Sequence, residues 1–135
     1  YDDPNVGIIR NDFTDTDIAF SPNVVGGISL NWRPIKAVDV QLFNKYVGRQ
    51  FLDNTSNEDR TLDAFFVTDF RASYSLFPSW AKEIRIGFQV NNLLSASYEP
   101  NGYTFSYKAG GSIITENFYY PMAPANAMAN LVIRL

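Results

Sequence analysis

The sequence predicts an all-β protein of antiparallel strands joined as hairpins. Apolar and polar residues alternate along segments 26–33, 37–51, 64–77, 83–94 and 127–135. This period-2 pattern is typical of strands with one apolar and one polar face. Groups of Pro, Gly, Asn and Ser separate the segments and favour turns. No stretch reads as a helix of useful length, so we expect hairpin-connected strands throughout.

The alternation assigns side chains to two faces of the predicted sheet. The apolar face receives Ile28, Leu30, Trp32, Val38, Val40, Leu42, Phe66, Phe70, Ile84, Ile86 and Phe88. The polar face receives Asp39, Gln41, Lys45, Arg49, Asp69, Arg71, Arg85, Gln89 and Arg134. Full charges in the middle of strands require that the polar face meets water or polar partners. We therefore expect two faces of very different chemistry.

The last strand runs to the end of the sequence. Ala127, Ala129, Leu131, Ile133 and Leu135 alternate with Met128, Asn130, Val132 and Arg134. Because chain termini usually fray, a strand in this position must be paired to be ordered. We expect the 83–94 segment to be its partner on one side.

The predicted connections alternate in length. Residues 34–36 and 78–82 are short, whereas 52–62 and 95–124 are long. Short turns at one end and long loops at the other are the layout of outer-membrane β-barrels, with the short turns in the periplasm. A strand of about 10 residues tilted near 45° spans about 23 Å, close to the apolar band of such barrels. Trp32, Tyr74 and Trp80 lie near the short-turn end, where an aromatic girdle would sit.

Composition excludes several functions. The 135 residues suit one domain and include no Cys and no His, which removes disulfides, thiolate or imidazole metal sites, and His or Cys catalysis. The net charge of −3 argues against nucleic-acid binding. The sequence contains no run of 18 apolar residues, so we expect no transmembrane helix, and we expect no signal peptide in it. We expect no catalytic residue, no metal and no cofactor.

The two remaining parts of the chain are less regular. At the start, residues 6–10 suit a short strand, 11–17 an acidic loop, and 21–23 a turn. The segment 95–124 is rich in aromatic residues, and Gly110-Gly111 predicts a hairpin turn within it. Possible loop contacts to a ligand are Tyr98, Tyr103, Tyr107, Tyr119 and Tyr120. The alternative for these tyrosines is an interfacial girdle or packing between loops.

Three motifs in order resemble TonB-dependent receptors. The stretch Asn91-Asn92-Leu93-Leu94, followed by Tyr98, resembles their penultimate-strand motif. The segments 44–54, with Tyr46-Val47-Gly48, and 118–135, with Phe118-Tyr119-Tyr120-Pro121 before the last strand, resemble two further parts of the family. The match covers about residues 20–135. One departure is Leu135, because the barrel-assembly signal of the family usually ends in an aromatic residue.

The resemblance implies the C-terminal part of a 22-stranded outer-membrane barrel of a Gram-negative bacterium. Residues 1–135 would be its last five or six strands, without the plug domain. Its partners would be the plug and the rest of the barrel, the TonB complex acting through the plug, the barrel-assembly machinery, and outer-membrane lipid. The polar face would line the lumen, the apolar face would meet lipid, and Leu131, Ile133 and Leu135 would belong to the assembly signal. The function implied is active uptake of an iron chelate, vitamin or glycan.

Other interpretations remain open at the level of sequence. A soluble β-sandwich binding module would use the same alternation but bury its apolar faces sheet on sheet. A small complete barrel needs at least eight strands, more than the sequence offers. Calcium binding by Asp53, Asn57 and Asp59 lacks the spacing of a calcium loop. An enzyme is the least supported interpretation.

Overall fold

The computed structural model describes residues 2–3, 7–8 and 12–135, and within these ranges the chain is all-β and antiparallel, as predicted. The strands are β1 (Asp2–Asp3), β2 (Gly7–Ile8), β3 (Val25–Ile35), β4 (Val38–Val47), β5 (Gln50–Phe51), β6 (Thr61–Leu62), β7 (Phe65–Leu76), β8 (Glu83–Asn91), β9 (Asn101–Ala109), β10 (Ser112–Tyr120) and β11 (Asn126–Arg134). The predicted strand at 6–10 is represented by β2, which pairs with β1. Residues 6, 9 and 10 lie outside the described ranges.

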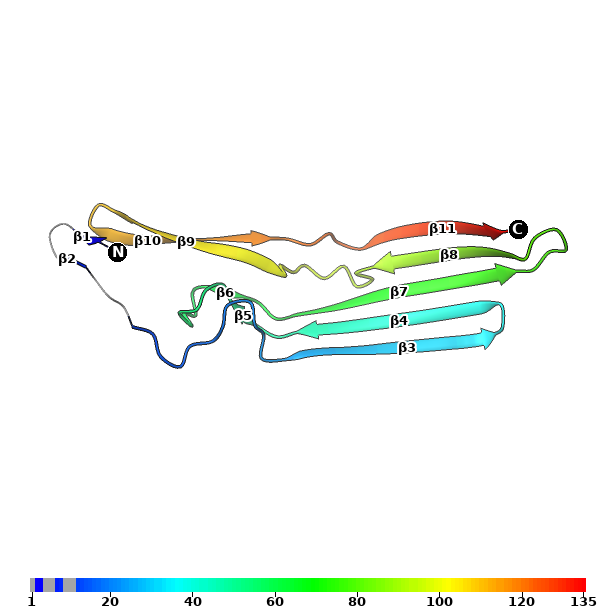
Figure 1. Ribbon diagram of the computed structural model, residues 1–135, viewed down its shortest axis with the longest axis horizontal. Helices are drawn as coiled ribbons and strands as arrows, with labels where there is room; N and C mark the ends of the chain where they lie inside the picture. Colours follow the sequence, from blue (N-terminus) through cyan, green and yellow to red (C-terminus); the bar gives the residue numbers. More distant parts are fainter. Residues whose placement is uncertain (1, 4–6, 9–11) are drawn as a thin grey trace.

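Five long strands form the main sheet in the order β11-β8-β7-β4-β3 (Figure 1). Every pairing is antiparallel, and hairpin connections join β3 to β4, β4 to β7 and β7 to β8. β11 returns from the β9–β10 hairpin to lie beside β8 over its whole length. The prediction that the last strand pairs with the 83–94 segment is therefore confirmed. Within the described ranges, β3 and β11 are the two edges of this sheet.

The register aligns apolar residues in rows across the sheet. One row joins Leu30, Leu42, Phe70, Val90 and Ala127, and the next joins Trp32, Val40, Ala72, Phe88 and Ala129. A third row joins Ile35, Val38, Tyr74, Ile86 and Leu131. Side chains on paired residues point to the same face. One face of the sheet is therefore apolar from edge to edge.

Two boundaries differ from the sequence prediction. The predicted strand 37–51 ends at Val47 and resumes as β5 in the same register, leaving Gly48 and Arg49 between the two pieces. Gly48 N–H instead bonds the carbonyl of Val24 at 2.8 Å. The first short turn is at residues 36–37, not 34–36. Pro34 lies within β3 at a register shift between Trp32 and Ile35, where its missing N–H is tolerated.

The connections alternate between two ends of the sheet, as predicted. The short ones, at 36–37 and 77–82, lie at the end where the chain terminates (Figure 1). Segments 12–24, 48–64 and 92–125 gather at the opposite end, which we call the long-loop end (Figure 1). There the predicted hairpin is formed by β9 and β10, which have nine residues each. Gly110 and Gly111 turn it with positive φ angles of 58° and 85°, which glycine adopts without strain.

The main sheet is a single layer. No other element lies across the five strands in Figure 1, and the main contacts between elements join paired strands. The accessible surface is 9693 Å², against about 7,100 Å² for a compact monomer of this mass. The buried apolar residues of the described chain are Val47, Phe51, Leu52, Leu62, Val67 and Ala81, mostly near the long-loop end. Within the described ranges no helix has the length and hydropathy needed to cross a membrane.

Candidate functional site

The polar face of the main sheet is hollowed. A depression of about 450 Å³ is lined by residues of all five strands, among them Asn31, Asp39, Arg71, Arg85 and Asn130. A second depression of about 300 Å³ lies beside it and is lined by Gln41, Phe43, Asp69 and Arg71. A single hollow can touch five neighbouring strands only if the sheet curls around it. The polar face is therefore the concave side at this point.

Most of the predicted polar-face residues meet here. Gln41, Arg71 and Gln89 occupy one register row across β4, β7 and β8. Asp39 is bound by Arg33 of the neighbouring strand, with 2.6 Å between Oδ1 and Nη2. Arg71 and Lys45 carry no ion pair within the described chain, and both side chains are exposed. The face thus offers free cationic groups among amides and hydroxyls.

A charged cluster lies at the short-turn end of the polar face. Glu83 Oε1 accepts from Arg85 Nη2 at 2.7 Å and from Ser75 Oγ at 2.9 Å, while its Oε2 accepts from Arg134 Nη1 at 2.8 Å. Two predicted residues, Arg85 and Arg134, therefore converge on one carboxylate. Sequence reasoning did not single out Glu83, because only the β7–β8–β11 pairing brings these groups together.

The opposite face carries apolar side chains that touch no other layer. Leu30 is 58% exposed, Trp32 66%, Ile86 49% and Leu131 62%. Burying such side chains stabilises a protein in water by about 1.5–3 kcal/mol each. Contiguous apolar patches on soluble monomers rarely exceed a few hundred Å². Here the exposed apolar rows extend across all five strands of the sheet. This surface requires an apolar surrounding or partner.

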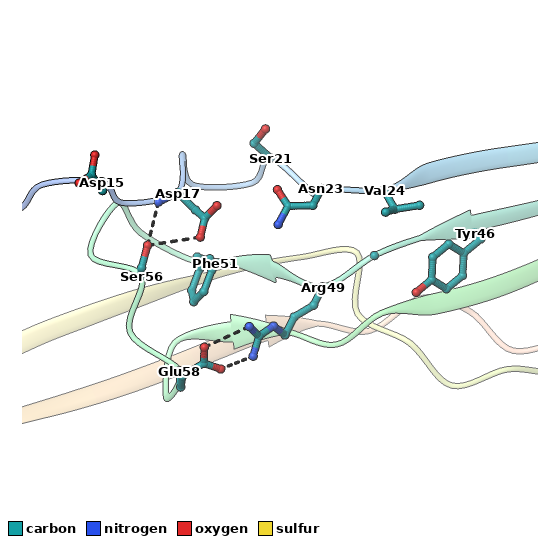
Figure 2. A pocket seen from close by; sticks show the side chains of 11 residues that line it. Asp15, Asp17, Ser21, Asn23, Val24, Tyr46, Arg49, Phe51, Ser56 and Glu58 are labelled. Carbon is teal, nitrogen blue, oxygen red and sulfur yellow. Dashed lines mark hydrogen bonds and ion pairs between the residues drawn. The ribbon is translucent and has the colours of Figure 1, made fainter.

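The long-loop end holds an open cleft of about 410 Å³ (Figure 2). It is lined by Asp15, Asp17, Ser21, Asn23, Val24, Tyr46, Gly48, Arg49, Phe51, Ser56 and Glu58. Ser56 Oγ accepts from the Asp17 N–H at 2.8 Å, and the Phe20 N–H bonds the Phe51 carbonyl at 3.0 Å. These bonds lay residues 17–20 along the β5–β6 segment.

Arg49 belongs to this cleft rather than to the main hollow. Its guanidinium pairs with Glu58 and lies 5.2 Å from the centre of the Phe51 ring (Figure 2). The hydrogen bond and charge of Glu58 raise the pKa of Arg49 above its ordinary value. Arg49 is therefore paired with groups of the protein, whereas Arg71 and Lys45 carry no ion pair within the described chain.

The five candidate loop tyrosines fall into three environments. Tyr103, Tyr107 and Tyr120 share one face of the β9–β10 hairpin, where Tyr103 stacks on Phe118 with 4.8 Å between ring centres. Tyr119 lies on the other face of the hairpin. Tyr98 stacks on Phe65, the first residue of β7, with 4.5 Å between ring centres. Packing against the start of β7 therefore accounts for Tyr98, while Tyr103, Tyr107 and Tyr120 form an exposed aromatic face.

Asn92 organises the start of the longest connection. It is 3% exposed and has a φ of 50°. Its Nδ2 donates to the carbonyls of Ala96 and Ala123, its Oδ1 accepts from the Ala96 N–H, and its own N–H bonds Asp69 Oδ1 at 2.9 Å. Asparagine is among the few residues that adopt this backbone region readily. The motif at 91–94 contained this residue, but the sequence did not reveal its partners.

Two of the three candidate calcium ligands, Asp53 and Asn57, already accept hydrogen bonds from protein groups. Asp53 accepts hydrogen bonds from Thr55 and from Arg60. Burial alone would raise the pKa of Asp53, but the hydrogen bonds from Thr55 and Arg60 outweigh burial and lower it. Within the described part of the chain, no three acidic side chains converge in the manner of a metal site.

Comparison with known proteins adds no family. No protein-family model, no curated protein and no solved structure matches the chain.

Proposed function

We propose that this chain is a C-terminal sector of the barrel of a TonB-dependent outer-membrane receptor. The observation that carries the proposal is the division of one curled layer into an apolar face and a hollow polar face. Soluble sheets cover their apolar face with a second layer, and within the described chain the main sheet has none. A membrane barrel needs no second layer, because lipid covers the apolar face and the polar face lines the lumen.

The height of the apolar face fits a bilayer. Aromatic residues mark both of its ends, with Tyr46 and Phe66 in one row and Tyr74 beside Val38 in another. The two rows are separated along β4 by about 27 Å, at about 3.4 Å per residue. With strands tilted near 40° this corresponds to about 20 Å across the membrane, close to the apolar band of roughly 25 Å.

The two unpaired edges fit the same proposal. β3 and β11 expose backbone N–H and C=O groups that other strands of a barrel would satisfy. In an intact receptor, β11 would meet the first strand of the barrel and β3 the strand before it in sequence. Closure would leave no open edge in the membrane.

In this proposal the faces have separate tasks. Lys45, Arg71 and Gln89 meet the plug or the transported ligand from the barrel wall, and the Glu83 cluster braces the periplasmic end. The long-loop end faces outward and contacts an iron chelate, vitamin or glycan. The TonB complex acts on the plug and not on these strands. No residue of the chain is assigned a catalytic role.

Localisation and the neighbouring sequence test the proposal together. We expect the protein that carries this chain to fractionate with the outer membrane and to resist extraction by alkaline carbonate. We also expect a plug domain with a TonB-binding segment to be encoded upstream of Tyr1. A protein recovered in soluble form from the periplasm, with no plug sequence upstream, would contradict the proposal.

A further inference from the structure

Two long connections contact each other at the long-loop end through Arg60. Within its own loop, Arg60 Nη1 donates to Asp53 Oδ2 at 2.6 Å. Its Nη2 reaches across to the β9–β10 hairpin and donates to Ser106 Oγ at 3.0 Å and Thr115 Oγ1 at 3.1 Å. The Arg60 side chain is only 18% exposed. A planar guanidinium fork is well suited to hold two segments at a fixed angle.

Further contacts extend along the same face of the hairpin. Asn117 Nδ2 donates to the backbone carbonyl of Asp59 at 2.6 Å. A Cβ atom on Gly102 would lie 3.2 Å from Leu52 Cδ2, so this loop packs against the hairpin backbone. Three successive cross-strand pairs lie on one face of the hairpin. The first contains Gly102, the second contains Asn117, and the third is Ser106 with Thr115. The contact is therefore continuous.

Both segments are separated from the main sheet by interruptions in the strand ladders. Residues 48–49 and 63–64 interrupt the ladder between β4–β7 and β5–β6. Residues 92–100 and 121–125 separate the β9–β10 hairpin from β8 and β11. The hairpin and the β5–β6 pair are each a separate two-stranded sheet. The hydrogen bonds between them thus join two pieces that the main ladder does not hold.

We infer that residues 50–62 and 101–120 form one cap that moves as a single body relative to the main sheet, with Arg60 as the latch between its halves. The inference rests on contacts within the chain and does not depend on the proposed function. It implies that a molecule contacting the aromatic face of the hairpin also alters the order of the 50–62 segment. Such coupling acts equally in both directions.

Hydrogen–deuterium exchange on the intact protein that carries this chain, in detergent, tests the latch. In Arg60→Ala we expect amide exchange to become at least tenfold faster in both 50–62 and 101–120, with β7 and β8 unchanged. Arg49→Ala is the matched control, because it removes an exposed ion pair of the same loop that does not reach the hairpin. Faster exchange in 50–62 alone would overturn the inference.

The hairpin side provides the reciprocal test. Ser106→Ala combined with Thr115→Val removes the two hairpin hydroxyls that accept from Arg60 Nη2. It leaves the loop of Arg60 and the bond from Arg60 Nη1 to Asp53 unchanged. We expect faster exchange in 50–62 as well as in 101–120. A change confined to the hairpin would show that the two segments move independently, and it would overturn the inference even if Arg60→Ala failed to fold.

Discussion

At the scale of single residues, the most demanding position is Asn92. Its side chain satisfies backbone groups of Ala96 and Ala123 and is buried. Asn92→Ala leaves these groups unsatisfied and places alanine at a positive φ. We expect a loss of at least about 2 kcal/mol in the free energy of unfolding, measured by denaturant titration in detergent. Asn91→Ala, which removes a more exposed bond to Asn126, should cost less than half as much; equal losses would contradict this role.

Asp53 gives a prediction about pH. Its pKa is lowered in the folded chain despite burial, because Thr55 and Arg60 donate to its carboxylate. Its contribution to stability is therefore complete above its unfolded pKa of about 4, and it is lost as the pH falls through the lower folded pKa. An NMR titration of the Asp53 carboxyl carbon should give a midpoint below about 4. A midpoint above the unfolded value would show that the Asp53 carboxylate is not held by these hydrogen bonds. In Asp53→Asn, the loss of folding stability at low pH that comes from this carboxylate should disappear.

At the scale of elements, β11 separates the two faces most clearly. Ile133 lies in the apolar row with Ile84, whereas Arg134 pairs with Glu83 on the polar side. We expect Ile133→Asp to block outer-membrane assembly of the protein, because in the proposed barrel it places a charge on the lipid face and within the assembly signal. Leu131→Asp should do the same.

Arg134→Ala is the matched control on the same strand. It should assemble nearly normally, because Arg85 still neutralises Glu83. Heat-modifiable migration of the outer-membrane fraction measures assembly in each variant. Normal assembly of both aspartate variants, or an equally severe defect in Arg134→Ala, would reverse the assignment of the faces.

The elements also indicate what the sequence can predict. Alternation predicted the faces of the long strands, because side-chain direction follows from the backbone period alone. It could not predict the break at Gly48, which depends on a bond to Val24 from a distant segment. The partners of Glu83, Asn92 and Arg60 were missed for the same reason, since each is brought to its site by pairing or loop contacts between remote residues.

At the scale of the whole molecule, the unusual feature is a large sheet with neither face covered. The described chain buries only a small apolar cluster near the long-loop end. An isolated layer of this kind would not be stable in water, because both its apolar face and its edges require partners. A closed membrane barrel supplies both, since lipid covers the face and further strands pair with the edges.

We propose that the apolar face of the main sheet meets lipid, and spin labels on β8 test this directly. The sequence contains no Cys, so a nitroxide label can be attached at single cysteines along β8, using Ile84→Cys, Ile86→Cys and Phe88→Cys against Arg85→Cys and Gln89→Cys. In the protein reconstituted into liposomes, the first three labels should be relaxed by oxygen, which partitions into lipid, and not by a water-soluble nickel complex. The labels at 85 and 89 should lack this lipid signature. Shielding of labels 84, 86 and 88 from both reagents, as in the core of a sandwich, would show that the apolar face does not meet lipid.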